Sequence, residues 1–380
     1  MEVADDRTFF SYASASGKNM HVIEESWVPV PFSGDDLVAH FKENFNLFAA
    51  ELQHKEKKHR LKIRRLFVNL PARFTRVSTV EHTVSFRREK KISIRDVLSA
   101  KQYVEESASE WGECCLHHVV ERYWVNGGES FSPPVGTWSG KIRLRCRLIW
   151  VRNNVWAELN EIATHFHTRL GGVIAEEMSV LSSSGDASGI LPEKAVLKIG
   201  YHDTVFLYWR KKKVISERRF PFGLRGIFCR MAERFSLSLP VAEQVFHRYF
   251  SLKPEVVRSS RRLGEVSVKS GDAYVNLSVG AVNRFLREVI HRELERILDE
   301  CIPEIGGDRT SVTVTGRLNG REGWARFLRE HFARPVLAAS ARESAAFGAS
   351  RYGLFPCLDR ETVPQKKFFR RISELYREYF

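Results

Sequence analysis

Residues 195–209 read AVLKIGYHDTVFLYW, and three lysines, Lys211–Lys213, follow one residue later. A short run this rich in apolar, β-branched and aromatic residues predicts buried β-structure. We expect a β-hairpin over these residues that turns at the lysines. Segments with helical spacing lie on both sides of it, so helices and strands alternate along the chain. The sequence therefore predicts the α/β class.

Elements of both kinds recur throughout the chain. Apolar residues at helical spacing predict helices at 37–52, 94–108, 156–170, 224–235, 240–250, 282–301, 322–332 and 338–352. Alternating or short apolar runs predict strands at 8–12, 20–31, 66–70, 74–86, 115–125, 141–151, 264–277 and 311–316. The first helix is expected to give way to a basic stretch at 54–65. No short-period repeat is present, which argues against a solenoid.

The strand at 141–151 has the clearest alternation in the sequence. One face of it should pack on the helix at 94–108 through five apolar residues: Ile142, Leu144, Cys146, Leu148 and Trp150. The opposite face carries four cations: Lys141, Arg143, Arg145 and Arg147. Two interpretations of this face are open, a solvated sheet surface, which we favour, and a docking surface for an acidic partner.

The charge of the chain narrows the class of partner. Its 380 residues include 60 Lys and Arg against 46 Asp and Glu, a formal net charge of +14. Such an excess favours an anionic partner, either nucleic acid or an acidic membrane surface. The first six residues, MEVADD, carry acids where a secretory signal needs cations, and no apolar run approaches the roughly 20 residues of a membrane span. We therefore expect a protein that starts and stays in the cytoplasm, with its six cysteines as free thiols.

No metal site is expected from the 13 histidines. His117 and His118 are adjacent, so they point to opposite sides of a strand. His165 and His167 are two residues apart, without carboxylate or thiolate ligands at a usable spacing. We interpret these residues as ordinary surface histidines.

Five segments, taken in order, resemble the FtsA family of bacterial actin homologues. They are 134–140 (PVGTWSG, similar to the family's PVGMSG signature with one extra residue), 153–170 with 172–174, 196–204, 315–323 and 345–349. Together they cover nearly the whole chain. The resemblance implies a two-lobed actin/Hsp70-like (ribonuclease H-like) α/β fold with an inserted α+β subdomain of SHS2 type and a C-terminal amphipathic helix.

The resemblance also implies how the chain divides. The first lobe would comprise 1–80, truncated at its N-terminus, together with 157–192 and a closing helix at 337–353. The inserted subdomain would be 81–156. The second lobe would comprise 193–222 and 288–336, with an outer subdomain at 223–287. A linker at 354–364 would lead to a membrane helix at 365–380.

In this family two phosphate hairpins and an adenosine motif hold the nucleotide, and each is altered here. The family's DIGGGTTD corresponds to KIGYHDTV at 198–205, and its TGGG corresponds to TGRL at 315–318. Phosphate hairpins need an acidic residue and closely approaching glycines. The first hairpin is interpreted as deleted, because residues 1–7 contain no glycine. The degenerate pocket would comprise Lys198, Gly200, Asp203, Thr204, Thr315, Gly316 and Arg317.

These losses predict a pseudo-ATPase rather than an enzyme, with no cofactor and with ATP and Mg²⁺ disfavoured. Two interpretations of Lys198 are open. It could act as a fixed cation for phosphate, or it could be an ordinary pairing residue at the lobe interface, which we favour.

The last sixteen residues predict an amphipathic helix. Its apolar positions share one helical face: Phe368, Phe369, Ile372, Leu375, Tyr376, Tyr379 and Phe380. The remaining positions carry five cations and two acids, a net charge of +3: Lys366, Lys367, Arg370, Arg371 and Arg377 with Glu374 and Glu378. At 1.5 Å per residue the helix would span about 24 Å, too short to cross a bilayer. We expect it to lie in the headgroup layer of an anionic membrane, as FtsA-family helices do; the alternative is docking on the protein's own surface.

The resemblance implies a cell-division adaptor that tethers an FtsZ-like polymer to the inner face of the cell membrane at the division site. A basic cluster in the outer subdomain would bind the acidic tail of the FtsZ-like protein: Arg258, Arg261 and Arg262. Self-association into filaments is left open. The alternatives are a PilM-like scaffold of pilus or secretion assembly, whose family usually lacks the terminal helix, an active ATPase, and a basic nucleic-acid-associated protein. The last is disfavoured because no helix-turn-helix, zinc or RNP pattern is present.

Overall fold

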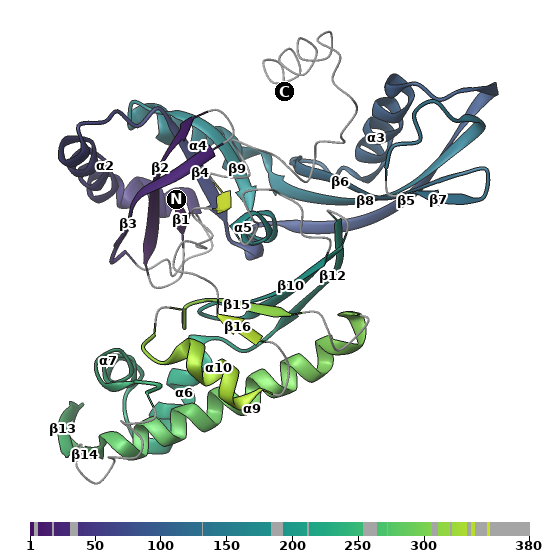
Figure 1. Cartoon of the computed structure of the whole chain (residues 1–380). Coiled ribbons are helices and arrows are strands. Elements are labelled where there is room, and N and C mark those ends of the chain that lie inside the picture. Colours follow the sequence, from purple (N-terminus) through teal and green to yellow (C-terminus); the bar gives the residue numbers. More distant parts are fainter. Residues whose placement is uncertain are drawn as a thin grey trace. The chain divides into compact units, whose positions relative to one another are not determined.

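The computed structural model describes residues 1–3, 7–16, 19–30, 37–130, 132–183, 193–210, 213–253, 264–271, 273–305, 311–319, 321–332, 336–338 and 348–349. The chain forms two compact units (Figure 1). The main unit comprises Met1–Ala72 and Glu158–Gly353, and the described part of the inserted unit is Arg73–Ala157. None of the helices in these ranges is long and apolar enough to cross a membrane.

The first sheet of the main unit has the strand order β3-β2-β1-β4-β9. Its strands are β1 (Glu2–Val3), β2 (Thr8–Ser16), β3 (Asn19–Val28), β4 (Arg65–Leu70) and β9 (Arg169–Ala175). β1, β2 and β3 are successively antiparallel, whereas β4 runs parallel to both β1 and β9.

The short strand β1 corrects one expectation from the sequence. The first hairpin, interpreted as deleted, is present in shortened form, because Glu2 pairs with Phe9 and Val3 with Thr8. Only residues 4–7 separate the two strands. β1 also bonds to β4, where the Asn69 N–H donates to the Met1 carbonyl at 2.7 Å. Backbone pairing on both sides therefore maintains the strand, although its turn contains no glycine.

A second correction concerns residues 37–65. In place of one helix that gives way near residue 54, the chain forms α1 (Leu37–Glu43) and α2 (Phe45–His59). α2 continues through the basic residues and ends at Arg60, which has a left-handed φ of 53°. Cations in the last turn are favoured by the helix dipole, so the basic composition supports the helix here.

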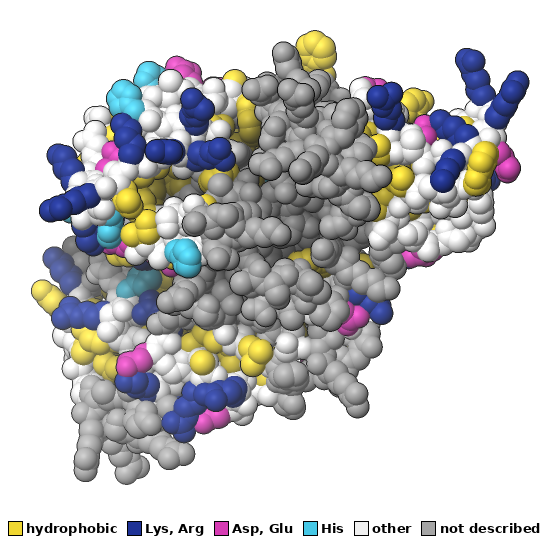
Figure 2. Space-filling view, turned by 45° about the horizontal axis from the view of Figure 1, so that its top comes forward, with side chains coloured by type: hydrophobic (Ala, Val, Ile, Leu, Met, Phe, Trp, Pro, Cys, Tyr) yellow, Lys and Arg dark blue, Asp and Glu magenta, His cyan; other side chains and the backbone are white. Residues whose placement is uncertain are grey.

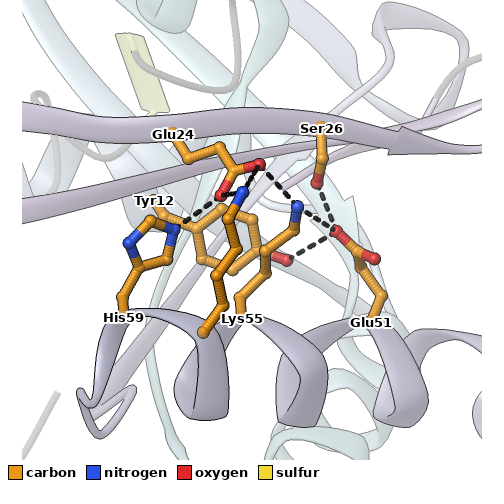
Figure 3. A network of polar contacts seen from close by, with 7 residues as sticks. Tyr12, Glu24, Ser26, Glu51, Lys55 and His59 are labelled. Atoms are coloured by element: carbon orange, nitrogen blue, oxygen red, sulfur yellow. Dashed lines mark hydrogen bonds and ion pairs between the residues drawn. The ribbon is translucent and has the colours of Figure 1, made fainter.

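A polar network fastens α2 to the β2–β3 hairpin (Figure 3). Glu24 on β3 accepts hydrogen bonds from Lys55 at 2.7 Å and Lys58 at 3.0 Å, and its Oε2 lies 2.6 Å from His59 Nε2. The hydrogen bond from Lys55, followed by those of His59 and Lys58, lowers the pKa of Glu24 to about 2. Three further side chains complete the network: Tyr12, Ser26 and Glu51. Part of the basic stretch is thus used within the fold.

The second sheet repeats the topology of the first, with the order β12-β11-β10-β15-β16. Its strands are β10 (Glu193–Ile199), β11 (Thr204–Arg210), β12 (Lys213–Phe220), β15 (Val312–Gly316) and β16 (Val336–Ala338). β10, β11 and β12 are successively antiparallel, and β10, β15 and β16 are parallel. Each sheet therefore has a central strand with an antiparallel hairpin on one side and two parallel strands on the other.

This sheet corrects two further expectations. The segment 195–209 turns at 200–203, and a third strand, β12, begins at Lys213 and pairs antiparallel with β11. β12 carries the charged residues Glu217, Arg218 and Arg219, so its sequence lacks the apolar pattern of a strand. It lies at the edge of the sheet. Of the helix expected at 338–352, the structure describes Ala338, which is the last residue of β16, and Gly348 and Ala349, which are helical; the remaining residues lie outside the described ranges.

Helices and a two-stranded hairpin pack together beside the second sheet around a large apolar core (Figure 1). They are α6 (Leu224–Phe235), α7 (Leu239–Tyr249), β13 (Glu265–Ser270), β14 (Ala273–Ser278), α9 (Val279–Ile305) and α10 (Trp324–His331). α9 buries Leu286, Ile290 and Leu294 completely. Two helices accompany β9, namely α4 (Asn153–His165) before it and α5 (Glu176–Ser183) after it.

The inserted unit is a four-stranded sheet, β5-β8-β6-β7, packed against one helix, α3. Its elements are β5 (Arg76–Lys91), α3 (Ile94–Ala108), β6 (Glu113–Val125), β7 (Gly128–Ser130) and β8 (Trp138–Arg152), preceded by a 3₁₀ turn at Ala72–Phe74. The five alternating apolar residues of β8 are buried against Val97, Ala100 and Val104 of α3. The expected strand and helix are therefore confirmed, together with their mode of packing.

The other face of β8 carries the four predicted cations, and three of them are paired. Arg143 lies 3.2 Å from Glu81, and Arg145 and Arg147 lie 3.2 and 3.0 Å from Glu121. Glu81 and Glu121 on the neighbouring strands thus pair with three of the four cations of this face. The pairing favours the interpretation of a solvated sheet face over a docking surface.

Candidate functional site

The residues expected to form the degenerate pocket lie together in the second sheet, at the carboxyl-terminal ends of β10 and β15. In the β10–β15 register Lys198 is opposite Thr315 and Ile199 is opposite Gly316, while Ile199 faces Thr204 on β11. The turn between β10 and β11 supplies Gly200 and Asp203, and Arg317 follows β15 directly. The seven residues predicted to form this pocket are therefore neighbours in space.

Lys198 is buried, with 8% of its surface exposed, and its ammonium is bonded within the chain. Its Nζ donates to Glu2 of β1 at 3.0 Å and to Glu176 of α5. Burial lowers the pKa of Lys198, but the charges of Glu176 and Glu2 outweigh burial and raise the pKa above its ordinary value. Lys198 is thus a charged residue that ties the second sheet to β1 and α5 of the first.

Glu176 uses both of its carboxylate oxygens. One accepts from Lys198, and the other accepts from the Ala72 N–H at 3.1 Å. Burial raises the pKa of Glu176, yet the charge of Lys198 and these hydrogen bonds lower it overall. The carboxylate is therefore ionised and fully engaged by the protein.

Glu177, the next residue of α5, has a different environment. Only 1% of it is exposed, and one oxygen accepts from Arg219 of β12 at 2.5 Å. The other oxygen is buried without a hydrogen-bond partner among the described residues. Burial, and then the nearby charge of Glu217, raises the pKa of Glu177 to about 7. The pKa values of these adjacent glutamates therefore shift in opposite directions: burial and the charge of Glu217 prevail at Glu177, whereas the charge of Lys198 outweighs burial at Glu176.

The main chain of the turn at 200–203 is hydrogen-bonded within the turn and to the start of α6. The Gly200 N–H donates to the Asp203 carbonyl at 2.8 Å, and the first N–H groups of α6, at Leu224 and Arg225, donate to the carbonyls of Gly200 and Tyr201. Helix N-termini are common anion sites because their N–H groups are free. Here the two N–H groups of α6 are occupied by the turn itself.

Gly316 brings β15 close to β10. Its φ is +102°, and a Cβ on it would lie 2.1 Å from the Ile199 carbonyl oxygen. The next residue, Arg317, donates its N–H to that same oxygen at 2.9 Å, and its guanidinium lies 4.3 Å from the centre of the Phe9 ring. The glycine is thus required for strand packing.

Five residues of the site were not identified from the sequence: Glu2, Glu176, Glu177, Glu217 and Arg219. The adjacent acids at 176–177 directly follow the apolar end of β9, and this is a weak local signal. No local pattern connects them with Lys198. Within the described ranges, no group of three or more His, Cys, Asp or Glu side chains is arranged to hold a metal ion.

Replacing Glu177 by glutamine should flatten the pH dependence of stability. The pKa of Glu177 rises from 4.5 to about 7 on folding, so the folded state binds the proton more tightly. The stability that protonation provides is present below pH 4.5 and is lost as pH rises to 7. We expect the free energy of unfolding of the wild type to fall by about 2–3 kcal/mol across this range.

The measurement is urea unfolding between pH 4.5 and 8 for the wild type, Glu177→Gln and the control Glu295→Gln. Glu295 is exposed on α9 and should leave the profile unchanged. Parallel profiles for the wild type and Glu177→Gln would contradict the assignment.

The other predicted binding residues cannot be placed. Arg258, Arg261 and Arg262, the linker at 354–364 and all membrane-helix residues from Lys366 to Phe380 lie outside the described residues.

No protein-family model matches the sequence, and no curated protein matches it. Among solved structures, a chain of the PilM–PilN type IV pilus biogenesis complex is similar over 94% of this chain and 98% of its own, with 14% identity and a TM-score of 0.59. MreB5 of Spiroplasma citri bound to ADP is similar over 56% of this chain and 69% of its own, with 14% identity and a TM-score of 0.42. At this identity the likeness concerns the fold. The chain has the two-lobed α/β fold of the actin/Hsp70-like proteins, with the two five-stranded sheets as the centres of its lobes.

Proposed function

We propose that this protein is an adaptor of actin/Hsp70-like fold that works without nucleotide and links a protein assembly to an anionic membrane surface. The observation that carries the proposal is the bonding of Lys198. This residue stands where the FtsA family has the first aspartate of its second phosphate hairpin, and it joins the two lobes through Glu2 and Glu176. At this position the ion pairs of Lys198 with Glu2 and Glu176 thus connect the two lobes.

The surrounding groups do not fit a magnesium nucleotide. Glu176 is saturated by hydrogen bonds, and Glu177 is bonded to Arg219. A phosphate would have to displace two carboxylates to reach Lys198. The main-chain N–H groups of Gly200, Leu224 and Arg225 already donate within the chain. These contacts support a pseudo-ATPase without ATP or Mg²⁺.

The membrane part of the proposal rests on the sequence of residues 365–380. Apolar burial and cations beside anionic lipid both favour the headgroup layer for such a helix. By the resemblance to the FtsA family, the other partner would be an FtsZ-like polymer, and the protein would lie on the cytoplasmic face of the membrane at the division site. The basic residues Arg258, Arg261 and Arg262 would suit an acidic tail.

Vesicle co-sedimentation tests the proposal. The full chain should pellet with anionic vesicles and remain in solution with neutral ones, and the chain truncated after Pro364 should pellet at least about tenfold less, because it loses its cations and its apolar face. MgATP should change neither result. A full chain that stays in the supernatant, or binding that requires MgATP, would refute the proposal.

A second candidate is a scaffold of pilus or secretion assembly. It is favoured by the likeness to the PilM–PilN complex, which extends over 94% of this chain. The two candidates differ in their protein partner. Comparing an FtsZ tail peptide with a PilN protein, both titrated onto the full chain, separates them, and saturable binding of one alone decides between the candidates.

A further inference from the structure

The end of the inserted unit where β5 finishes and β8 begins carries an unpaired basic cluster. β5 ends in the sequence FRREKK, residues 86–91, and residues 87–91 are all exposed. Lys90 is paired with Asp96. Three other cations of this end have no ion-pair partner in the described part of the chain: Arg87, Arg88 and Lys91. Lys141, on the adjacent strand, is likewise exposed and unpaired. Figure 2 shows Lys and Arg side chains gathered at the right-hand end of this unit.

Two apolar side chains are exposed among these cations. Trp138 is directly opposite Lys91 in the β5–β8 register and is 63% exposed. Val135, in the preceding loop, is 43% exposed. We call the set Arg87, Arg88, Lys91, Val135 and Trp138 the basic tip. Exposed apolar groups surrounded by cations differ from the rest of this sheet, where the cations of β8 are paired with glutamates.

Main-chain hydrogen bonds hold the basic tip in place. Ile92 donates to the Thr137 carbonyl at 2.9 Å, and Gly136 donates to the Ile92 carbonyl at 2.8 Å. Asn126, from the β6–β7 turn, donates to the Trp138 carbonyl at 2.7 Å and accepts from Ser139 at 2.9 Å. The bond from Asn126 is made to the main-chain carbonyl of Trp138, and 63% of the Trp138 surface is exposed. The tip is a fixed platform whose side chains face solvent.

We propose that the basic tip is a membrane-contacting surface that inserts Trp138 into the headgroup layer of an anionic bilayer. Tryptophan is enriched at this depth, because its ring is apolar and its N–H is polar. Within and beside the basic tip, five cations (Arg87, Arg88, Lys90, Lys91 and Lys141) and two acids (Glu89 and Asp96) give these seven residues a net charge of +3. This charge complements an anionic leaflet over several lipids at once. The contact is additional to the terminal helix, and it does not depend on the proposed function.

The chain offers a matched control at the opposite end of the same strand. Trp111 is fully exposed in the loop before β6, and Arg152 is exposed at the end of β8. β8 has 15 residues, so at ~3.3 Å per residue its ends are roughly 45 Å apart. The pair Lys91→Ala/Trp138→Ala and the pair Arg152→Ala/Trp111→Ala each remove one cation and one tryptophan. They differ in location along the sheet.

The experiment measures partitioning of the full chain onto vesicles that contain about 30% phosphatidylserine, at about 0.15 M salt. The tip pair should weaken partitioning roughly tenfold or more, and the control pair should stay within about twofold. Both variants should retain the thermal unfolding temperature of the wild type. Equal loss in both pairs, or no loss in the tip pair, would overturn the proposal.

The same variants in the chain truncated after Pro364 separate this proposal from the terminal helix. If the truncated chain still partitions weakly onto vesicles, and the tip pair abolishes this partitioning, the result supports the proposal that the basic tip contacts the membrane. If truncation removes all binding and the tip pair changes nothing in the full chain, the tip proposal fails while the adaptor proposal stands. Tip-dependent binding to an acidic polypeptide or to DNA, without any tip-dependent binding to vesicles, would overturn the assignment to a membrane.

Discussion

Replacing Lys198 by methionine should lower the free energy of unfolding of the main unit by about 3–5 kcal/mol. Methionine preserves most of the apolar stem and removes the charge. Glu2 and Glu176, whose side chains are 12% and 16% exposed, would then remain buried without their cation. Breaking a buried ion pair costs far more than the net value of the intact pair, because the remaining charge is desolvated and uncompensated.

The effect of Lys198→Met can be measured by urea unfolding at pH 7, with Lys58→Met as the matched control. Lys58 also pairs with a glutamate, but its side chain is 50% exposed, so its loss should cost less than about 1 kcal/mol. Adding Glu176→Gln to Lys198→Met should restore part of the stability, because one orphaned charge is removed. A loss below about 1 kcal/mol for Lys198→Met, or no recovery in the double variant, would show that the ion pairs do not join the lobes.

The second large effect is expected from Gly316→Ala, at about 3 kcal/mol or more. The new Cβ would meet the Ile199 carbonyl oxygen at 2.1 Å, and a backbone atom cannot rotate away as a flexible side chain can. Strand β15 would have to move from β10, and the hydrogen bond from the Arg317 N–H to Ile199 would weaken. The left-handed φ of +102° adds strain of its own.

Gly271→Ala separates these two contributions. Gly271, in the β13–β14 turn, also has a positive φ, +64°, but a Cβ there would meet nothing within 4 Å. Its replacement should cost about 1 kcal/mol from strain alone. Thermal and urea unfolding of both variants give the comparison. Equal costs would mean that the close approach of β15 to β10 has no energetic importance.

The local parts of the fold could be predicted from sequence wherever one pattern governed a segment. The helix expected at 94–108 coincides with α3, whose apolar face is regular and whose start is fixed by the Ser93–Asp96 capping box. Strand β8 was predictable because basic and apolar residues alternate in it from Lys141 to Leu148. Predictions were wrong where tertiary contacts override the pattern. β12 is polar because it is an edge strand, and α2 continues because Glu24 binds its terminal cations.

The candidate site could be predicted only in part. The resemblance to the FtsA family grouped Lys198, Thr315 and Gly316, and the parallel pairing of β10 with β15 places them side by side. The partners of Lys198 could not be found this way. Glu2 is 196 residues away and Glu176 is 22 residues away in the sequence. The function of the lysine depends on those partners, so its two interpretations could not be separated before the fold was known.

The ion pairs of Lys198 also bear on how such a protein can evolve. An aspartate at position 198, as the resemblance to nucleotide-binding relatives would suggest for an ancestor, would now lie beside Glu2 and Glu176 and place three carboxylates together without a cation. Like charges in a buried site repel strongly. A return to metal chemistry would therefore need several simultaneous substitutions, each harmful when made alone. Selection that acts on single substitutions would therefore retain the lysine at position 198. The internal ion pairs make the loss of the metal-binding aspartate difficult to reverse.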